Sequence, residues 1–476
     1  MHDIIVIGAG VIGGLIAREL AKYNLDVLIL EKDNDVANGT TAANSAIVHS
    51  GYDPKPGSKK AYFNVKAVPM FKNLCADLDV EFKRIGSLTV AQSKEELPLL
   101  EELKKRAIEN GVEVKILSKS EVMRLEPNLE DHIEGALFAP TAGIVNPFEL
   151  TANAIENALD NGVKLALNAK VNAITKVDDY FIVKTSEHEY KTKLIINAAG
   201  VYADNIINLV SKAEFSITPR KGSYFVIDKL ATPLVNSVVF PLPNQYSKGI
   251  LAVPTTAGNF LIGPTSEEIM SKEDVGTDYE SLQKIKDNAN RLLKNIPFHK
   301  TIRTFSGLRA TPSTGDFVIE HDPYVKGLIN VAGIESPGLA SAPAIAIYVV
   351  HDLVGSLIKL HRKLQFNPHI RPRIRASKLK GKELKALVKE NKDYATLVCN
   401  CEEITKAEII DLLKRPIPVK SVKAIKKRLR AGFGLCQGGF CTPKVIEIMA
   451  EYYGVPVSDI AYDEKESYVV KEHEKV

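Results

Sequence analysis

The chain has 476 residues, 45% of them hydrophobic and 25% charged, which is typical of a folded protein with two or three domains. Its net charge of +4 is too small to indicate a nucleic-acid-binding protein. The longest apolar run, Gly338 to Val350, contains Pro343 and is shorter than the ~18 residues of a membrane span. The first apolar residues belong to a predicted strand and not to a signal peptide. We therefore expect a cytoplasmic protein that has no membrane span and binds no nucleic acid.

The N-terminal residues predict a strand, a tight turn and a helix. Ile4 to Ile7 is an apolar run, Gly8-Ala-Gly10-Val-Ile-Gly13 follows it, and residues 11–23 have helical character. The next predicted strand ends at Glu31, whose carboxylate can bind the hydroxyl groups of a ribose. Three glycines and an acidic residue in this order predict a dinucleotide site, with the pyrophosphate at the helix N-terminus. The alternative is a tight turn that binds no nucleotide.

Two later segments have the pattern of further contacts to the same cofactor. Residues 194–200 and 327–333 are each predicted to be a strand that ends in small residues, and Pro337-Gly338 follows the second one. Small residues at the carboxyl ends of parallel strands let a ligand cross the edge of a sheet. The alternative for each segment is close packing of a strand against a helix.

The middle of the chain predicts a mixture of helices and short strands. Helices are predicted at 61–78, 95–110, 147–161 and 279–295, and Ser118-x-x-Glu121 is a capping box for another helix. Short strands separated by turns are predicted at 223–227, 237–240, 250–253 and 259–262. This spacing favours an antiparallel sheet.

Four of the five cysteines lie within 43 residues near the C-terminus. Cys399 and Cys401 form C-x-C, and Cys436 and Cys441 form C-x-x-x-x-C, with 34 residues between the two pairs. Clustered cysteines in a reducing compartment favour a metal site over disulfides, and four thiolates are the usual ligands of an iron–sulfur cluster. Structural zinc and a site that has lost its metal are the alternatives. Cys75, on a predicted helix, is expected to be an inert core thiol.

The order of the first segments, together with Gly39-Thr-Thr-Ala-Ala-Asn-Ser-Ala-Ile-Val-His49-Ser-Gly51, resembles the FAD-dependent D-amino-acid oxidase / glycerol-3-phosphate dehydrogenase superfamily over residues 1–350. This resemblance implies FAD and an α/β fold, in which a Rossmann-like FAD-binding domain is interrupted by an antiparallel β substrate domain. The FAD-dependent part is then 1–360, with FAD-binding pieces at about 1–80, 145–215 and 325–360 and the substrate domain at about 81–144 and 216–324.

The same resemblance implies which residues contact the cofactor. The expected FAD contacts are Gly8, Gly10, Val11, Ile12, Gly13, Glu31, Lys32, Thr40, Thr41, Asn44, Ser45, Val171, Ala199, Gly200, Gly307, Gly333, Gly338 and Leu339.

Oxidation of a secondary alcohol needs a base for the hydroxyl proton and a cation for an anionic substrate. The superfamily places the segment of His49 near the flavin and an arginine at Arg309 facing the substrate, so we expect these two to be catalytic. The alternatives are a structural histidine and an ordinary ion pair. Lys221 and Tyr224, on an early strand of the substrate domain, are predicted to line the substrate pocket, unless they form a solvated strand end.

The segment from Cys399 to Cys441, with its Gly-Phe-Gly-Leu-Cys436-Gln-Gly-Gly-Phe-Cys441 sequence, closely resembles the [2Fe-2S] domain of bacterioferritin-associated ferredoxin. The resemblance implies a small α-rich [2Fe-2S] domain at 395–455, with Cys399, Cys401, Cys436 and Cys441 as ligands. A basic linker at 361–394 precedes it and a tail at 456–476 follows. Between His351 and Val398, 12 lysines and arginines stand against 4 acidic residues, so this stretch is also a candidate docking surface for an acidic partner.

The two parts together look most like FAD-dependent glycerol-3-phosphate dehydrogenases of the anaerobic type. This implies oxidation of sn-glycerol 3-phosphate, a small anionic hydroxy substrate, to dihydroxyacetone phosphate. Electrons would then pass through the cluster to a partner protein subunit, expected to be a second flavoprotein. The segment from Asn44 to Gly51 is also similar to L-2-hydroxyglutarate dehydrogenases. The alternatives are therefore a 2-hydroxy acid dehydrogenase, an amino-acid or amine oxidase, and a flavin-bearing subunit that mainly conducts electrons.

Overall fold

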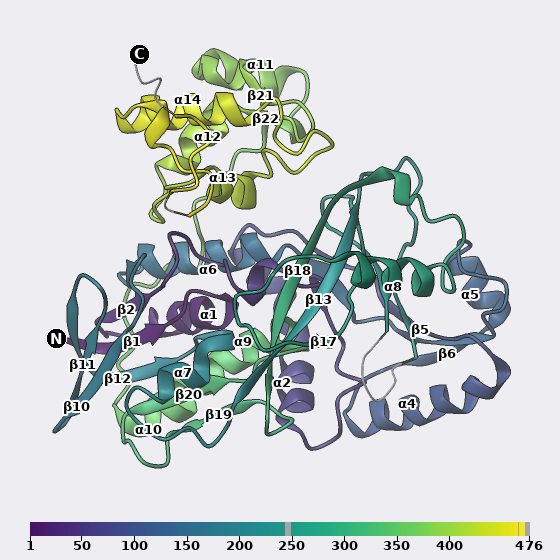
Figure 1. Ribbon diagram of the computed structural model, residues 1–476, viewed down its shortest axis with the longest axis horizontal. Helices are drawn as coiled ribbons and strands as arrows, with labels where there is room; N and C mark the ends of the chain where they lie inside the picture. Colours follow the sequence, from purple (N-terminus) through teal and green to yellow (C-terminus); the bar gives the residue numbers. More distant parts are fainter. Residues whose placement is uncertain (243–248, 465, 472–476) are drawn as a thin grey trace.

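The computed structural model describes residues 1–242, 249–464 and 466–471, and its first large sheet contains the N-terminal strand (Figure 1). The strands are His2–Ile7 (β1), Val27–Leu30 (β2), Lys164–Ala166 (β9), Ala173–Val177 (β10), Tyr180–Lys184 (β11), Glu189–Asn197 (β12), Val318–His321 (β19) and Leu328–Ala332 (β20). Their order is β10-β11-β12-β1-β2-β9, with β20 and β19 beside the carboxyl half of β12. The pairs β9–β2, β2–β1, β1–β12 and β12–β20 are parallel, whereas β10, β11 and β19 are antiparallel additions.

Both faces of this sheet are buried, as the apolar run in β1 predicts. Ile4 and Val6 face a core that is covered by Val11–Leu20 (α1), Lys59–Ala67 (α2), Phe71–Asp77 (α3), Pro147–Asp160 (α6) and Gly338–Tyr348 (α9). Ile5 and Ile7 point to the opposite face and pack with residues of β11 and of Ala203–Ile207 (α7). The first sheet is therefore a central layer with apolar packing on each side.

The second large sheet is almost wholly antiparallel. Its nine strands among the described residues are Ser87–Ala91 (β5), Lys115–Ser118 (β6), Gly135–Ala139 (β7), Ile217–Ile227 (β13), Val238–Pro241 (β14), Leu251–Pro254 (β15), Phe260–Gly263 (β16), Glu267–Glu268 (β17) and Thr301–Pro312 (β18). Only β5 and β14 pair in parallel. Within this sheet β13 and β18 pair along almost their whole length as a long ribbon (Figure 1). Ile47–Val48 (β3), Phe82–Arg84 (β4) and Gly143–Val145 (β8) form a separate small sheet.

The predicted elements are present, with shifted ends. The four predicted strands are parts of β13, β14, β15 and β16, and the predicted helices correspond to α2–α3, Leu97–Glu109 (α4), α6 and Tyr279–Ala289 (α8). The helix predicted at 61–78 is interrupted by a 3-10 turn at Val68–Met70, because Pro69 lacks an N–H group. The capping box opens Lys119–Leu125 (α5) as expected.

The domain boundaries given above remain predictions, but strand pairing differs from them at one point. β19 lies in the predicted substrate domain, yet it pairs with β20 in the first sheet. The tail predicted at 456–476 lies partly outside the described residues.

The helix that contains the longest apolar run extends beyond that run. α9 continues through a π-helical segment, Val349–Val354, into Gly355–Leu357 (α10), so that the helix spans 20 residues. Among the described residues it alone has the length and composition to cross a membrane, but 67% of its most apolar window is buried inside the molecule. Its apolar composition is that of a core helix packed against α1 and α2.

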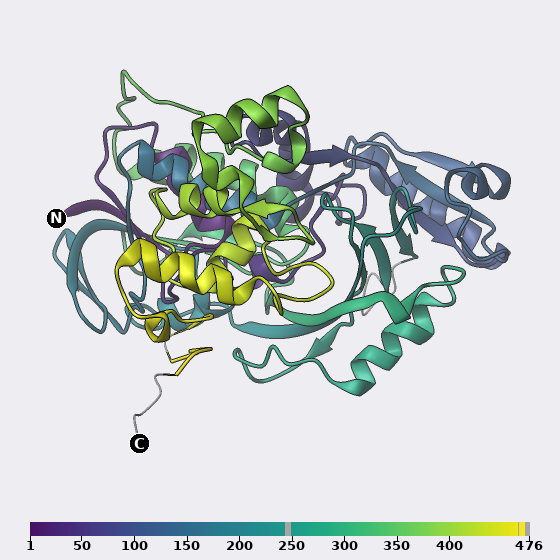
Figure 2. The same cartoon turned by 90° about the horizontal axis from the view of Figure 1, so that it is seen from above.

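The C-terminal lobe lies over the first sheet on the side of α6 (Figures 1 and 2). It contains Lys382–Glu390 (α11), Leu397–Cys399 (β21), Ile404–Thr405 (β22), Lys406–Leu413 (α12), Val422–Leu429 (α13) and Thr442–Tyr453 (α14). Its separate apolar core includes Ile409, Ile425 and Met449, each fully buried. The lobe is thus α-rich, as predicted.

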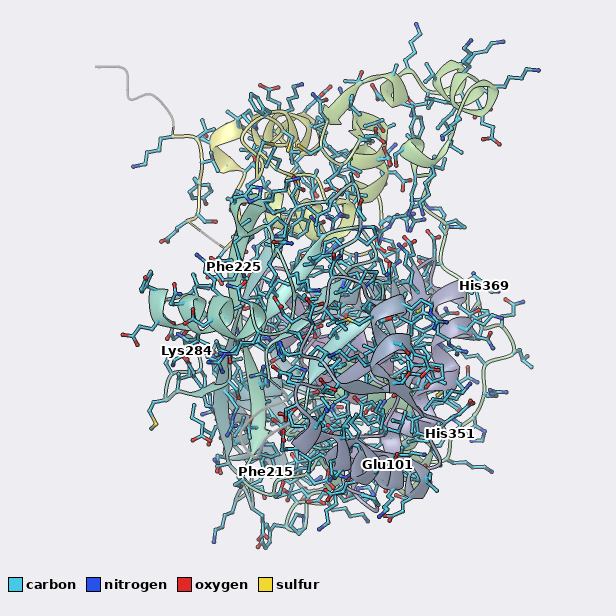
Figure 3. The ribbon with its side chains drawn as sticks, turned by 90° about the vertical axis from the view of Figure 1, so that its right-hand side faces the viewer. Glu101, Phe215, Phe225, Lys284, His351 and His369 are labelled. Carbon is cyan, nitrogen blue, oxygen red and sulfur yellow. The ribbon has the colours of Figure 1, made fainter. Side chains whose placement is uncertain are left out.

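The segment predicted to be a basic linker is partly packed into the molecule. Figure 3 shows it near His369, where it leaves the lower body for the C-terminal lobe. Arg371 pairs with Asp411, and Arg375 pairs with Asp79 at 2.8 Å. Arg373 is only 9% exposed and donates to Asn153 and to a main-chain carbonyl of α13. This half of the segment therefore fastens the lobe, and its arginines are not a free docking surface.

Two buried ion-pair groups join the lobe to the body. Asp35, 1% exposed, pairs with Lys427 at 2.8 Å and with Arg428, both at the end of α13. Arg415 pairs with Glu156 of α6 at 2.6 Å. Burying these charges costs free energy that only their partners offset. These ion pairs therefore hold the lobe in one defined position on the body.

We expect Asp35→Asn to weaken the attachment of the lobe to the body, because the substitution leaves two buried cations without their carboxylate. Removing one partner of a buried ion pair costs about 3–5 kcal/mol. Amide hydrogen exchange in α13 should show a fall of this size in the free energy of local opening. Asp131→Asn, which removes an exposed ion pair with Lys294, is the control and should leave exchange unchanged. Unchanged exchange in both variants would mean that the Asp35 pair is not what holds the lobe.

Candidate active site and cysteine centre

The turn between β1 and α1 needs its glycines. Gly8 has φ +107°, and a Cβ there would lie 2.5 Å from the carbonyl oxygen of Ala198 at the end of β12. A Cβ on Gly13 would lie 2.0 Å from the carbonyl oxygen of Gly8. The first glycine therefore permits the turn, and the third lets α1 pack directly on it. α1 begins directly after this turn, at the carboxyl end of β1, and a helix N-terminus in that position favours an anion.

Glu31 ends β2 beside this turn. Its carboxylate accepts hydrogen bonds from the amides of Ala9, at 2.8 Å, and Asp33, at 3.1 Å. Burial raises its pKa, and these amides act in the opposite direction. The carboxylate is thereby held at the edge of the cavity, in the position where a ribose of a dinucleotide would meet it.

A cavity of about 1380 Å³ opens at the carboxyl ends of β1, β2, β12 and β20 and extends to the β13–β18 ribbon. The predicted residues that line it are Gly8, Gly10, Val11, Ile12, Glu31, Lys32, Thr40, Thr41, Asn44, Ser45, His49, Val171, Ala199, Gly200, Tyr224, Gly307, Arg309, Gly338 and Leu339. The cavity therefore runs from the glycine-rich turn to the predicted substrate residues. This long shape fits a dinucleotide whose two ends lie far apart.

Two predicted cofactor residues do not line the cavity. Gly13 supports the turn from behind, as described above. Gly333 has φ +64°, and a Cβ there would lie 2.6 Å from Pro312 at the end of β18. Both glycines shape the walls of the cavity through packing, and we assign them no direct contact with a ligand.

The β13–β18 ribbon forms the wall opposite the glycine-rich turn. Arg220, Gly222 and Tyr224 of β13 line the cavity, and so do Gly307 and Arg309 of β18. These residues share one face because side chains alternate along a strand.

The prediction for Lys221 is wrong for the same reason. Its side chain points to the other face, where its ammonium pairs with Asp274 at 3.0 Å. Arg220, which the sequence reading passed over, takes its place in the cavity. The sequence did indicate this position, because Arg220 and Tyr224 are an even number of positions apart on a strand and therefore lie on the same face.

The guanidinium of Arg309 uses only part of its hydrogen-bond donors within the described residues. Its Nη2 donates to the carbonyl oxygen of Thr265 at 3.1 Å, whereas its Nη1 is buried and has no hydrogen-bond partner among the described residues. A buried guanidinium nitrogen without an acceptor is costly in free energy. An anionic ligand in the cavity would supply that acceptor.

Tyr224 lies next to Arg309 and to the segment predicted to face the flavin. Its hydroxyl is 2.9 Å from Oγ of Ser45, and its ring stacks on Phe305 with centroids 4.7 Å apart. Burial raises the pKa of the Tyr224 hydroxyl, and Arg309 partly offsets this. The tyrosine therefore remains a neutral donor at neutral pH.

His49 follows β3 and lines the same end of the cavity. Its carbonyl oxygen accepts a hydrogen bond from Asn64 at 2.7 Å, and its ring lies against Phe240 with centroids 5.7 Å apart. The histidine is thus fixed by its main chain and its ring plane. Structure and sequence together bring His49, Tyr224 and Arg309 to one end of one cavity.

The four C-terminal cysteines form two pairs. Cys399 and Cys441 are buried and hydrogen-bonded to each other, and Cys401 and Cys436, which are more exposed, have their sulfurs 4.0 Å apart. The Cys441 thiol and the amides of Gly432, Glu402 and Cys401 lower the pKa of Cys399 to about 6. The pKa of Cys436 is also lowered, mainly by the amides of Phe440 and Gly438. The thiolate forms of Cys399 and Cys436 are therefore stabilised, the first mainly by the Cys441 thiol and the second by main-chain amides, whereas the Cys399 thiolate raises the pKa of Cys441. Thiolates are the form that binds metal.

Four cysteines in two pairs fit an iron–sulfur cluster, whose usual ligands are four thiolates. Among the described residues, no three His, Cys, Asp or Glu side chains converge closely enough to hold a single ion. Gly434 lets the second loop approach the first, since a Cβ there would lie 2.1 Å from Cβ of Cys401. Cys75, in contrast, is buried in α3 and its pKa is raised to about 12 by burial, as expected of an inert core thiol.

The cysteine loop lies close to the wall of the cavity. Phe433 in this loop packs against Phe148 in the first turn of α6, with ring centroids 6.1 Å apart. The same helix packs against Thr40–Ala42, which lines the cavity. Two aromatic rings and one helix turn therefore connect the two candidate centres.

Comparison with known families agrees with both halves of this description. A family model described as FAD dependent oxidoreductase (DAO) matches residues 3–351. A model described as BFD-like [2Fe-2S] binding domain matches residues 397–451 and so includes all four cysteines.

Individual relatives support the same division. A glycerol 3-phosphate dehydrogenase of Caloramator mitchellensis is 46% identical over 471 residues, which cover 99% of this chain and 98% of that protein. A glycerol 3-phosphate oxidase of Mycoplasma genitalium is 32% identical, covering 77% of this chain and 97% of its own length. Among solved structures, the dithionite-reduced L-α-glycerophosphate oxidase of Mycoplasma pneumoniae with FAD bound has a TM-score of 0.75 at 31% identity, over 78% of this chain and 99% of that one.

The resemblances noted in the sequence are thus confirmed for both cofactors. The chain belongs to the family of FAD-dependent oxidoreductases, and it carries a BFD-like [2Fe-2S] binding domain at its C-terminal end.

Proposed function

We propose that this enzyme oxidises sn-glycerol 3-phosphate to dihydroxyacetone phosphate and passes the electrons through its [2Fe-2S] cluster to a partner protein. The observation that carries the proposal is the buried, unpartnered Nη1 of Arg309 in the cavity that also holds His49. It is supported by the full-length relative described above, which is a glycerol 3-phosphate dehydrogenase. A secondary hydroxyl and an anionic group match this pair of residues.

The chain's own residues would divide the work as follows. Arg309 binds the anionic end of the substrate through its free Nη1, and Tyr224 donates its hydroxyl beside it. His49 accepts the proton of the substrate hydroxyl, and the hydrogen on the same carbon leaves with its electron pair. FAD, when bound, accepts that hydride, and the cluster accepts electrons one at a time. The ribbon packs tightly against Ala43 at this end, since a Cβ on Gly307 would lie 2.3 Å from the carbonyl oxygen of Ala43.

The electrons would leave on the exposed side of the cluster. Cys401 is exposed, and Leu435 and Phe440 beside Cys436 are 69% and 82% exposed. Exposed apolar side chains of this size are typical of protein contact sites. We infer that the acceptor is a protein, a second flavoprotein subunit, with α11 and its lysines as a nearby basic surface for it. FAD would occupy the one glycine-rich dinucleotide turn among the described residues, so we do not expect NAD⁺ to be the acceptor.

We further infer a cytoplasmic location. None of the five cysteines, all within the described residues, forms a disulfide. Reduced thiols and an iron–sulfur domain suit a reducing compartment. No observation supports a nucleic acid partner.

Anaerobic mixing with candidate substrates tests the proposed reaction. Glycerol 3-phosphate should bleach the flavin absorbance of the purified holoenzyme, whereas L-2-hydroxyglutarate and D- and L-amino acids should not. The chain should then reduce artificial dyes but not NAD⁺. Faster bleaching by L-2-hydroxyglutarate or an amino acid would replace the proposed substrate, and efficient NAD⁺ reduction would remove the partner protein from the proposal.

His49→Ala should slow anaerobic flavin reduction by glycerol 3-phosphate on the order of 10²-fold, because the hydroxyl proton loses its acceptor. FAD content should not change. His321→Ala is the matched control, since His321 lies outside the cavity and bonds only Ser356 among the described residues. If both variants reduce flavin at the wild-type rate, His49 is a structural residue.

Cys436→Ser should remove the cluster but leave flavin reduction by substrate largely intact, because the residues that line the cavity belong almost entirely to the body. Iron and sulfide analysis, FAD content and the rate of anaerobic flavin bleaching measure the three parts of this expectation. Cys75→Ala should keep the cluster. Loss of FAD from the Cys436 variant would show that the lobe is needed to complete the flavin site.

A further inference from the structure

A loop of the body that lines the cavity is held by the C-terminal lobe. The loop runs from Asp33 to Gly39 and follows Glu31, the residue placed to meet a ribose. Asp33, Asn34, Asn38 and Gly39 all line the cavity. The position of this loop therefore shapes the end of the cavity where Glu31 lies.

The body holds this loop through main-chain hydrogen bonds. The amide of Asn168 donates to the carbonyl oxygen of Asp33 at 2.9 Å, and the amide of Ala37 donates to the carbonyl oxygen of Ala9 at 3.0 Å.

The side chains of the loop have their partners in the lobe. Among the described residues, every hydrogen bond and ion pair made by the side chains of Asn34, Asp35 and Asn38 goes to the lobe. Asp35 is only 1% exposed, so its charge depends on these partners.

Lys427 of α13 makes most of the contacts to the loop. Its ammonium pairs with Asp35 at 2.8 Å and donates to the carbonyl oxygen of Val36 at 2.7 Å and to Oδ1 of Asn38. Lys427 is 4% exposed and is not among the residues that line the cavity. Its effect on a ligand in the cavity must therefore pass through the loop.

The tail of the lobe contacts the same loop. Lys423, near the start of α13, holds the tail twice: its amide donates to the carbonyl oxygen of Tyr462 at 2.8 Å, and its ammonium pairs with the carboxylate of Asp463. The carbonyl oxygen of Asp463 accepts a hydrogen bond from the side chain of Asn34, and Glu464 lines the cavity. Helix and tail thus hold the loop from one rigid unit.

We propose that the cluster lobe retains FAD in the body, and that Lys427 is the positioning residue for this role. α13 and the tail fix the loop Asp33–Gly39, and release of the loop opens the end of the cavity next to Glu31. Coupling between two sites is reciprocal, so bound FAD also stabilises the attachment of the lobe. The proposal concerns the cofactor alone and does not depend on which substrate the enzyme oxidises.

The rate at which FAD leaves the full-length holoenzyme tests this role. Free and bound flavin are separated at intervals after dilution into buffer without FAD. Lys427→Met should speed release at least ~10-fold, the loss expected for a hydrogen bond to a charged group. Iron and sulfide content should stay at the wild-type level, because the partners of the Lys427 ammonium all lie in the body. Lys427→Arg, which keeps the charge and its donors, should restore much of the retention.

Lys406→Met is the matched control. It removes a lysine of the same lobe whose partner, Glu451 at 3.1 Å, also belongs to the lobe. FAD should leave this variant at the wild-type rate. Equal rates in Lys406→Met and Lys427→Met would reduce the effect to general loss of stability and overturn the proposal.

A chain that ends at Tyr462 tests the tail separately. It lacks the carbonyl oxygen that binds Asn34 and also lacks Glu464. It should keep its cluster and release FAD faster than wild type. If Lys427→Met does not fold, this chain decides alone, and release at the wild-type rate would overturn the proposal.

Amide hydrogen exchange tests the reciprocal effect. Removal of FAD from the wild-type chain should speed exchange in α13 but not in α14, because only α13 holds the loop. Lys427→Met should abolish this dependence on FAD, a result that a merely structural role would not produce. Equal exchange of α13 with and without FAD in the wild-type chain would overturn the proposal. None of these measurements uses glycerol 3-phosphate, so their outcome is separate from that of the proposed reaction.

Discussion

The close packing of β1, α1 and β12 around Gly8 is the constraint on which the rest of the molecule depends. Three main-chain segments meet there at distances that exclude any side chain larger than hydrogen. This contact fixes the carboxyl ends of the parallel strands at one edge, and the cavity opens along that edge. The cofactor site is therefore a consequence of how the first forty residues pack against the end of β12, and other segments are added around it.

The β13–β18 ribbon forms the second half of the site, and there the geometry of paired strands determines the positions of the side chains. Strand alternation decides which side chains face the cavity, and pairing register decides which of them meet. Gly222 and Gly307 keep the centre of the ribbon open, so that the long side chain of Arg309 can cross it and the ribbon can approach Ala43. The walls of the cavity thus come from sheets of opposite type, one mostly parallel and one mostly antiparallel.

The C-terminal lobe is attached to the part of the body that forms the cofactor site. Lys427 of α13 pairs with Asp35 and also donates to the carbonyl oxygen of Val36, in the loop that leads to Thr40 and the cavity. A few residues later in the same lobe, the amide of Gly432 donates to Cys399. A short stretch of chain therefore links the two cofactor sites mechanically, and Phe148 and Phe433 bring them close together. Fixed geometry of this kind favours electron transfer within one chain.

Local pattern was enough to predict the glycine-rich turn, the helices and strands of the body, and the four cysteines, because each depends on residues close together in sequence. Most of the predicted cofactor residues also line the cavity. Pairing register and side-chain direction depend on partners that are distant in sequence, and only the tertiary structure decided them. It showed that Arg220, and not Lys221, lines the cavity, because side chains of adjacent residues on a strand point to opposite faces of the sheet. The segment around Arg373 was predicted to be a linker, but its arginines attach the lobe to the body. The sequence did not indicate this, because the carboxylates that pair with them come from other elements.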